Sequence, residues 1–387
     1  MNLSQLTPEQ QSTITALSLK MGSLSFYAKF TRVETGPIIT QYYFKPTPTS
    51  QLNKIMSKTE DLALCVGVES LIIQRQLDEI SISVPNRIRT TIKFDSCLQW
   101  LSTDPSANLA KLPLLMGQTP TGCNFTLDLA TQPHILIAGS TGSGKSVFLS
   151  QLITSLAVQR SPDELKLILV DTKQLDLTLF SSLDHVTEMV DKIDQLYDVM
   201  DGLLLEVRKR TETMKGICRN ISEWNMLRMG KQFPYYVLVI DELADVIGQD
   251  LEIAKQEKRE KEDISDRRTR ISTSLKSLAQ ISRAVGIHII AATQRPSIKV
   301  IDGDVKTNFP TRISFKLPTS VDSRVILDEN GAENLLGKGD YLYCTSQSSG
   351  PVRGHGSFVT MEDIGLVLSQ HEYIRESFRF QREQINK

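Results

Sequence analysis

The sequence predicts an α/β protein in which a doubly wound, mostly parallel sheet with a phosphate-binding loop follows a small α+β domain. Apolar runs typical of buried strands alternate with helical segments from Lys111 onward. A glycine-rich loop, GSTGSGKS at residues 139–146, follows an early strand of that series. The residues before the series combine helix-like and strand-like segments without this alternation. We therefore expect two domains, 1–112 and 113–387.

The first domain is predicted to be a small α+β unit. Thr7 suits the N-cap of a first helix because Pro8 follows at the first helical position. The other predicted elements are a strand at residues 36–44, a helix at 50–67 and strands at 70–75 and 79–84. Residues 102–110, STDPSANLA, have the composition of a loop, so we place the domain boundary near Leu112.

The second domain is predicted to have strands at residues 135–138, 165–170, 236–240, 287–292, 312–317 and 341–344. Most are continuous apolar runs, as expected for strands that helices cover on both faces. Ligands of such sheets bind at the carboxyl ends of the strands. His134 and His288 are expected to be core residues with a hydrogen-bonded ring nitrogen.

The composition is that of an ordinary globular protein, because 40% of the 387 residues are hydrophobic and 23% are charged. The N-terminus lacks the layout of a signal peptide, and no apolar run approaches the roughly 20 residues that cross a bilayer. Five cysteines are scattered without close pairs, which argues against a zinc site or a disulfide framework. We expect a cytoplasmic protein without a membrane segment.

The net charge of −1 gives no support for nucleic-acid binding, since small DNA-binding domains are usually strongly basic. It does not exclude DNA, because a ring can concentrate a few basic residues per subunit in its channel. Residues 250–270 carry seven basic and seven acidic side chains. That balance favours a solvated helical extension with ion pairs between turns over an arm that contacts DNA or a partner.

The glycine-rich loop fits the pattern G-x-x-x-x-G-K-[ST] and predicts a site for ATP and Mg²⁺. Glycines let successive backbone N–H groups point at phosphate oxygens, and the following helix adds its positive N-terminal end. Lys145 can reach the β- and γ-phosphates, and the Ser146 hydroxyl can ligate Mg²⁺. The candidate nucleotide-binding residues are Gly139, Ser140, Thr141, Gly142, Ser143, Gly144, Lys145, Ser146 and Val147.

Two further strands end in candidate catalytic residues. The run YYVLVI ends in Asp241, which we assign to Mg²⁺, and Glu242, which we assign to orienting and deprotonating an attacking water. Gln294, after the strand at 287–292, is the predicted sensor of the γ-phosphate or the lytic water. Asp171 and Lys173 follow the strand at 165–170. They either contact the ligand or form an ion pair with each other, and the residue types alone do not decide between these alternatives.

Phosphoryl transfer also needs positive charge on its transition state, often from an arginine of a neighbouring subunit. The candidates are Arg283, eleven residues before Gln294, and Arg312, which opens the next strand. Arg295 and Arg324 are weaker alternatives.

The blocks LPLLMG, PHILIAGSTGSGKS, LVDTKQLDL, VLVIDELAD and RAVGIHIIAATQRPS occur in this order between residues 112 and 297. A longer block, FPTRISFKLPTSVDSRVILDENGAENLLGKGDYLY, follows at residues 309–343, and PVRGHGSFV follows at 351–359. In this series the chain resembles the motor module of the FtsK/SpoIIIE family of double-stranded DNA translocases. The segment GPIITQYYF extends the resemblance into the first domain, which looks like the family's α domain.

The resemblance implies a RecA-like motor that assembles as a hexamer around double-stranded DNA and pumps it by hydrolysing ATP between subunits. Lys145, Ser146, Asp241 and Glu242 would have the roles given above, and the arginine finger would be Arg312 or Arg283. Loops that grip the DNA backbone would lie at residues 324–339 and around 353. The resulting DNA-binding candidates are Arg324, Lys338 and Arg353.

We expect the chain to depart from the family pattern, with neither N-terminal transmembrane helices nor a winged-helix domain after the motor. We therefore expect a motor without a septal tether, of a kind that suits a plasmid, an integrative element or a phage. Two alternatives stay open. One is a soluble coupling ATPase that uses ATP as a switch to recruit a DNA–protein substrate, and the other is an ATPase that acts on a protein without DNA.

Overall fold

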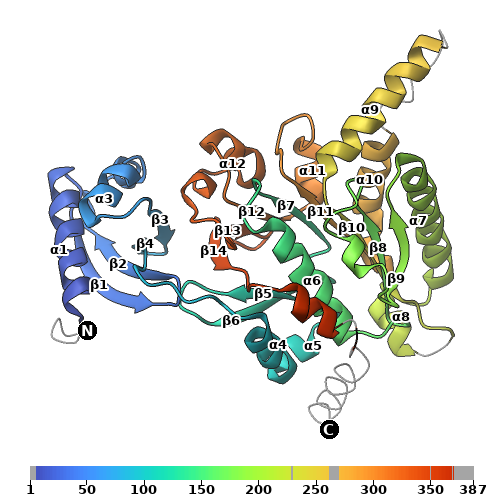
Figure 1. The fold of residues 1–387 in the computed structure, drawn as a ribbon, viewed down its shortest axis with the longest axis horizontal. Coiled ribbons are helices and arrows are strands. Elements are labelled where there is room, and N and C mark those ends of the chain that lie inside the picture. The colour runs from blue at the N-terminus through green and yellow to red at the C-terminus, as the bar shows by residue number, and fades with distance from the viewer. Residues whose placement is uncertain (1–5, 228–229, 261–269, 349, 368, 370–387) are drawn as a thin grey trace.

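The computed structural model describes residues 6–227, 230–260, 270–348, 350–367 and 369, which form two sheets with their helices (Figure 1). A four-stranded sheet has the order β1-β2-β4-β3, and a ten-stranded sheet has the order β6-β5-β14-β13-β12-β7-β11-β10-β8-β9. The small sheet lies at one end of the elongated molecule, on the left in Figure 1. The predicted fold class, an α/β domain after a small α+β domain, is confirmed.

The small sheet is antiparallel and packs against helices on one face. Its elements are α1 (Pro8–Ser23), β1 (Ala28–Thr35), β2 (Ile39–Pro46), α2 (Leu52–Met56), α3 (Thr59–Val66), β3 (Ile72–Gln76) and β4 (Glu79–Pro85). Thr7 caps α1 as predicted, since its hydroxyl accepts the Gln10 N–H at 3.2 Å and the Gln10 side chain accepts the Thr7 N–H at 2.9 Å. The sequence does not predict β1. No residue of this strand is fully buried, so it lacks the apolar run by which the other strands are recognised.

The large sheet is parallel from β12 to β9 and antiparallel from β6 to β12. Its parallel strands are β7 (His134–Ala138), β8 (Leu165–Val170), β9 (Val186–Val190), β10 (Tyr235–Ile240), β11 (Ile287–Thr293) and β12 (Thr311–Phe315). The antiparallel part comprises β5 (Pro113–Gln118), β6 (Asn124–Asp128), β13 (Asp340–Cys344) and β14 (Val352–His355). Every strand predicted in this domain is present, whereas β5, β6, β9 and β14 are not predicted.

Alternate residues of the central strands face two separate cores. In β7, Ile135 and Ile137 join the core that contains α6, while Leu136 and Ala138 join the core on the opposite face. The helices of the first core include α4 (Phe94–Thr103), α5 (Pro105–Leu109) and α6 (Lys145–Gln159). Those of the second are α7 (Ile193–Met214), α9 (Leu243–Glu260), α10 (Arg270–Ile281), α11 (Gly303–Asn308) and α12 (Ser320–Leu327), while α8 (Ile221–Leu227) touches both cores. Burial on both faces explains the continuous apolar runs.

The prediction of a loop at residues 102–110 is wrong, because α4 ends and α5 begins within it. The Asp104 carboxylate caps α5 by accepting the N–H groups of Ser106 at 2.9 Å and Ala107 at 3.0 Å. Pro105 occupies the first turn, where its missing N–H costs nothing. The Asp-Pro pair is therefore the start of a helix.

The packing of α4 bears on where the two domains divide. Phe94, Cys97 and Leu101 are buried in the core of the large sheet. We therefore propose that the division falls between Pro85, which ends β4, and Phe94, rather than near residue 112.

The charged segment at residues 250–270 lies only partly within the described chain. Helix α9 continues through it to Glu260, as expected for a helical extension, and residues 261–269 lie outside the described part. Its first residue is anchored, because the buried Asp250 carboxylate accepts the Tyr197 hydroxyl at 2.8 Å and the Ile271 N–H at 3.0 Å.

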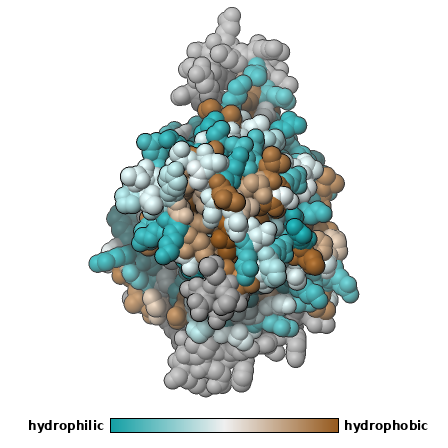
Figure 2. All heavy atoms as spheres, turned by 90° about the vertical axis from the view of Figure 1, so that its left-hand side faces the viewer, coloured by the Kyte–Doolittle hydropathy of each residue, from teal (hydrophilic) through white to brown (hydrophobic). Residues whose placement is uncertain are grey.

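The surface of the first domain mixes apolar and polar side chains, as Figure 2 shows for that end of the molecule. Exposed apolar side chains of this domain include Leu19 in α1, Leu64 in α3 and Leu77 between β3 and β4. Such side chains are common on protein surfaces when they are scattered. Across the described ranges, no helix combines the length and the apolar character that a membrane span requires.

His134 and His288 are buried in the large sheet, as predicted. The expected hydrogen-bonded ring nitrogen is present in His288, but neither ring nitrogen of His134 has a hydrogen-bond partner within the described residues. Their ring centroids lie 6.3 Å apart, and the Nδ1 of His288 donates to the Pro133 carbonyl at 3.1 Å. Burial lowers the pKa of His134 to about 3 and the pKa of His288 to about 4. Both rings are therefore neutral in the folded chain at pH 7.

The free energy of unfolding should fall as the pH is lowered from 6.5 to 4. In this range the two histidines take up protons in the unfolded chain, where their pKa is about 6.5, but hardly in the folded chain, so protonation favours unfolding. At pH 5 we expect a loss of about 2 kcal/mol per histidine relative to pH 8, measured by urea denaturation. His134→Phe should remove its own share of this loss, about 2 kcal/mol at pH 5. An unchanged dependence in that variant would contradict the assignment.

Candidate active site

The glycine-rich loop joins the end of β7 to the start of α6, so its N–H groups lie at the carboxyl edge of the sheet. Two of its glycines have no room for a side chain. A Cβ on Gly139 would lie 2.6 Å from the Ser143 Oγ and 2.7 Å from the Phe315 Cβ. Gly144 has a φ of 105°, and a Cβ there would lie 2.5 Å from the Gly339 N. The loop is therefore confined to a tight curl of the kind that binds phosphate.

The loop and its surroundings fit a phosphate group. The buried Ser143 Oγ lacks a hydrogen-bond partner within the described chain. A cavity of about 780 Å³ opens over the loop and is lined by Ser140, Thr141, Gly142 and Lys145, among others. Buried polar groups normally have partners, and phosphate oxygens would supply acceptors for these donors.

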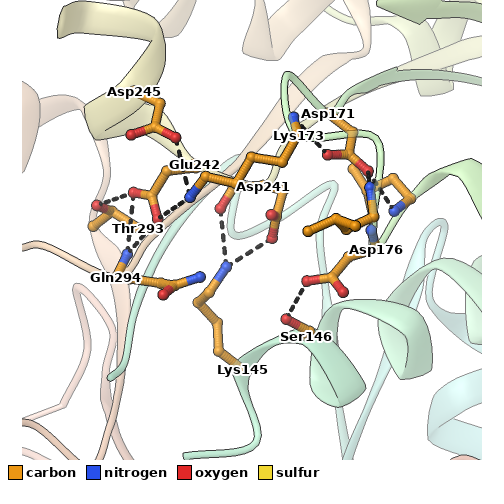
Figure 3. Close-up of polar contacts among 12 residues, drawn as sticks. Lys145, Ser146, Asp171, Lys173, Asp176, Asp241, Glu242, Asp245, Thr293 and Gln294 are labelled. Atoms are coloured by element: carbon orange, nitrogen blue, oxygen red, sulfur yellow. Dashed lines mark hydrogen bonds and ion pairs between the residues drawn. The ribbon is translucent and has the colours of Figure 1, made fainter. Parts of the chain in front are cut away.

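Lys145 is buried at the start of α6 and bonds to the residue that follows β10 (Figure 3). Its ammonium lies 2.7 Å from the Asp241 Oδ1 and 2.9 Å from the Asp241 carbonyl oxygen. The Asp241 side chain is also buried, so the two opposite charges compensate each other. A lysine ammonium has three donors and two are used here, which leaves one for a ligand.

Glu242 is held by the neighbouring strand β11. Its carboxylate accepts the Thr293 hydroxyl at 2.6 Å and the Gln294 N–H at 3.0 Å. The Gln294 side chain in turn accepts the hydroxyl of Thr141, a loop residue, at 2.9 Å. The structure thus brings together the predicted residues Asp241, Glu242 and Gln294 beside the phosphate loop (Figure 3).

Lys173, one of the two residues that the sequence left open, forms an ion pair across the site. Its ammonium lies 3.0 Å from the Asp245 carboxylate and 3.8 Å from that of Glu242. Desolvation lowers the pKa of Lys173, but the hydrogen bond to Asp245 and the charges of Asp245 and Glu242 outweigh it, so the pKa is raised. Lys173 therefore stays protonated beside Glu242 at pH 7.

Asp171, the other open residue, orders the loop that follows β8. Its Oδ2 accepts the N–H groups of Leu175 at 3.0 Å, Asp176 at 3.0 Å and Leu177 at 2.9 Å. This loop carries Asp176, whose carboxylate accepts the Ser146 hydroxyl at 2.5 Å. Sequence reasoning missed Asp176, although an acid in the loop that follows a strand at the carboxyl edge of the sheet is a usable signal.

The other half of the cavity is built from segments that sequence reasoning did not connect with the site. Residues 89–92, between the small sheet and α4, line it together with residues 336–339 and 355–358. The Phe358 N–H donates to the Ile92 carbonyl at 2.8 Å, which joins two of these segments, and the Phe358 ring is half-exposed. Burial lowers the pKa of His355, so its ring is neutral at pH 7. Arg89 and Lys338 add positive charge to this half of the cavity, while Ile92 and Phe358 give it an apolar part. A partly apolar surface beside a phosphate loop suits a nucleoside.

Comparison with protein families agrees with this geometry. The model of the FtsK/SpoIIIE family matches residues 106–298, and that of the FtsK alpha domain matches residues 3–86. This chain belongs to the FtsK/SpoIIIE family. The first match covers the large sheet from β5 to β11 with its phosphate loop, and the second covers the small sheet.

Curated relatives in the FtsK/SpoIIIE family include proteins named DNA translocase FtsK. That of Treponema pallidum is 34% identical over 371 residues, which is 91% of this chain and 44% of that protein. That of Borreliella burgdorferi is 34% identical over 372 residues, which is 94% of this chain and 44% of that protein. The chain thus spans less than half the length of these relatives.

Solved structures show the same fold. The pCW3 conjugation coupling protein TcpA, in a monomer form with ATPγS, has a TM-score of 0.65 at 23% identity, over 94% of this chain and 99% of that chain. The cytoplasmic domain of the type VII secretion ATPase EccC from Thermomonospora curvata has a TM-score of 0.59 at 22% identity, over 73% of this chain and 34% of that chain. Both likenesses concern the fold, that of a P-loop NTPase.

The two candidates for the arginine finger, Arg283 and Arg312, differ in their surroundings. Arg283 is exposed before β11, at the edge of the sheet opposite the phosphate loop, and donates a long hydrogen bond of 3.4 Å to the Thr131 carbonyl. Arg312 forms an ion pair with Asp328 at 2.5 Å, and Lys306 binds the same carboxylate at 2.6 Å. Arg283 is therefore the more exposed and the more weakly bound of the two side chains.

The prediction that Arg353 contacts DNA is wrong for this structure. The Arg353 side chain lies buried in β14 and is bidentate to Asp340, with bonds of 2.9 Å from Nε and 2.7 Å from Nη2. A DNA phosphate cannot reach it there. The next residue, Gly354, also lies in β14, and a Cβ there would lie 2.6 Å from the Tyr341 ring.

The other two DNA-binding candidates lie apart. Lys338 is exposed and lines the cavity over the phosphate loop, where the neighbouring Gly339 N–H donates to the Ser143 carbonyl at 2.9 Å. This position suits a nucleotide contact better than a DNA contact. Arg324 is exposed on α12, donates to Asn330 at 3.2 Å and remains a candidate for DNA.

Arg353→Ala should lower the free energy of unfolding by about 3–5 kcal/mol, because it leaves Asp340 as an uncompensated buried charge. Arg324→Ala, the matched control on the surface, should change it by less than about 0.5 kcal/mol. Urea denaturation measures both values. If Arg353→Ala keeps the stability of the unmodified chain but binds DNA more weakly, Arg353 contacts DNA and its assignment as a buried structural residue is wrong.

Proposed function

We propose that this chain is the ATP-hydrolysing motor of a double-stranded DNA translocase that works as a ring of identical copies, which we expect to be a hexamer. The observation that carries the proposal is the convergence of Lys145, Asp241, Glu242 and Gln294 at the phosphate loop of an FtsK/SpoIIIE chain. Relatives that are 34% identical are named DNA translocases. A ring is compatible with the net charge of −1, since a few basic residues per copy suffice in a shared channel.

In this proposal ATP lies with its triphosphate in the loop and its base in the other half of the cavity. The N–H groups of Gly139, Ser140 and Ser143 donate to backbone carbonyls. The N–H groups of residues 141–142 and 144–146, together with the Lys145 ammonium, would bind the phosphate oxygens. Phe358 and Ile92 offer apolar surface to the base. Ser146 and Asp241 would hold Mg²⁺, which neutralises charge on the phosphates when it is bound.

Glu242 is the general base of the proposed reaction. Thr293 and Gln294 fix its carboxylate, and the remaining lone pairs can accept a proton from water as that water attacks the γ-phosphate. Gln294 also bonds to Thr141 of the loop, so a phosphate in the loop competes for the same groups. Binding of the γ-phosphate would therefore change the hydrogen bonds of Gln294, and through them the position of the Glu242 carboxylate.

A neighbouring copy would complete the site. The transition state of phosphoryl transfer needs positive charge beyond that of Lys145, often an arginine supplied in trans. Of the two expected positions we favour Arg283, which is exposed and lies away from its own phosphate loop, over Arg312, which Asp328 neutralises. Hydrolysis would then depend on assembly.

The proposal is tested by displacement of a third strand from a linear duplex. The chain should displace the third strand only with ATP and Mg²⁺. Lys145→Ala should bind ATP at least tenfold more weakly and displace nothing, because it removes the charge that holds the phosphates. Glu242→Gln should bind ATP normally yet hydrolyse it at least 100-fold more slowly, because it removes the general base.

Other results would replace the proposal. Hydrolysis that duplex DNA stimulates, without any displacement, would favour a coupling ATPase that uses ATP as a switch. Hydrolysis that is indifferent to DNA would favour an ATPase that acts on a protein partner.

A further inference from the structure

Asp176 takes no part in the mechanism given above, yet it contacts the hydroxyl assigned to the metal. Its Oδ2 lies 2.5 Å from the Ser146 Oγ, at the short end of the range for a hydroxyl bonded to a carboxylate (Figure 3). We propose that Asp176 is a positioning residue that orients the Ser146 hydroxyl toward Mg²⁺. The inference rests on the proposed nucleotide site and adds a residue to it.

The stereochemistry of the hydroxyl is the first step of the argument. A serine hydroxyl has one proton and two lone pairs, and only a lone pair can ligate a metal. When Asp176 accepts the proton of Ser146, the lone pairs are left to face the loop. Partners of this kind behind a metal ligand fix its orientation and raise its basicity.

The rigidity of the Asp176 loop is the second step. Asp171 is 2% exposed and accepts three successive N–H groups of this loop, including that of Asp176 itself. Leu177 and Phe180, just after Asp176, are buried in the core that contains α6. The carboxylate is therefore held at a fixed position relative to Ser146, since both are anchored to the same core.

The composition of the site is the third step. Within the residues that the structure describes, no group of three or more acidic, histidine or cysteine side chains could hold a metal by itself. Magnesium therefore needs phosphate oxygens and water as its remaining ligands, and it depends on a correctly aimed Ser146. Asp176 acts on the metal through that hydroxyl.

Asp176→Asn separates this role from a merely structural one, because the substitution keeps the shape and removes the charge. With ATPγS present, we expect it to weaken the affinity for Mn²⁺, counted by electron paramagnetic resonance, by at least tenfold. In EDTA, the affinity for ATPγS alone should be unchanged or higher, because a negative charge beside the triphosphate is gone. The two affinities should thus respond differently.

Asp191→Asn is the matched control. Asp191 follows β9, its carboxylate accepts the side chain of Gln174 in the Asp176 loop at 2.6 Å, and its bond is to Gln174 rather than to Ser146. It should leave both affinities unchanged. An Mn²⁺ affinity within twofold of the unmodified chain in Asp176→Asn would overturn the proposal, as would an equal loss of nucleotide affinity in EDTA. If the unmodified chain binds no ATPγS with or without Mn²⁺, the proposed function itself fails.

Discussion

The buried ion pair between Lys145 and Asp241 constrains the rest of the site. Burying either charge alone would cost several kcal/mol, so the start of α6 and the end of β10 must meet at bonding distance. The register of the parallel strands supplies that meeting, because Ala138 of β7 pairs with Thr293 of β11, and Ala291 of β11 pairs with Ile240 of β10. The three strand ends therefore lie together at one edge of the sheet.

A second set of bonds depends on the same register. Glu242 follows β10 and reaches Thr293 and Gln294 at the end of β11, while Gln294 reaches back to Thr141 in the loop. This chain of hydrogen bonds connects the place where phosphate binds to the acid that would activate water. A bound phosphate would replace Asp241 as the partner of Lys145 and Gln294 as the partner of Thr141. Both Asp241 and Gln294 would then need new hydrogen-bond partners, because buried polar groups are normally paired.

Much of the fold and of the candidate site could be predicted from the sequence, and the residues that were missed were missed for physical reasons. Continuous apolar runs predicted the parallel strands other than β9, and residue types at their ends predicted Lys145, Asp241 and Glu242. Asp176 and the segments around Ile92 and Phe358 were missed, because their roles arise from contacts between distant parts of the chain. Arg353 was misplaced for the same reason, since its partner Asp340 lies on the neighbouring strand and nothing local in the sequence indicates burial.

The most direct test of this account is a structure of the chain with ATPγS and Mg²⁺. We expect the Lys145 ammonium to bond to a phosphate oxygen at about 2.7–2.9 Å and the Asp241 carboxylate to be released toward the metal. The Asp176–Ser146 bond should persist. A structure in which Lys145 keeps both of its bonds to Asp241, while the triphosphate lies outside the loop, would contradict it.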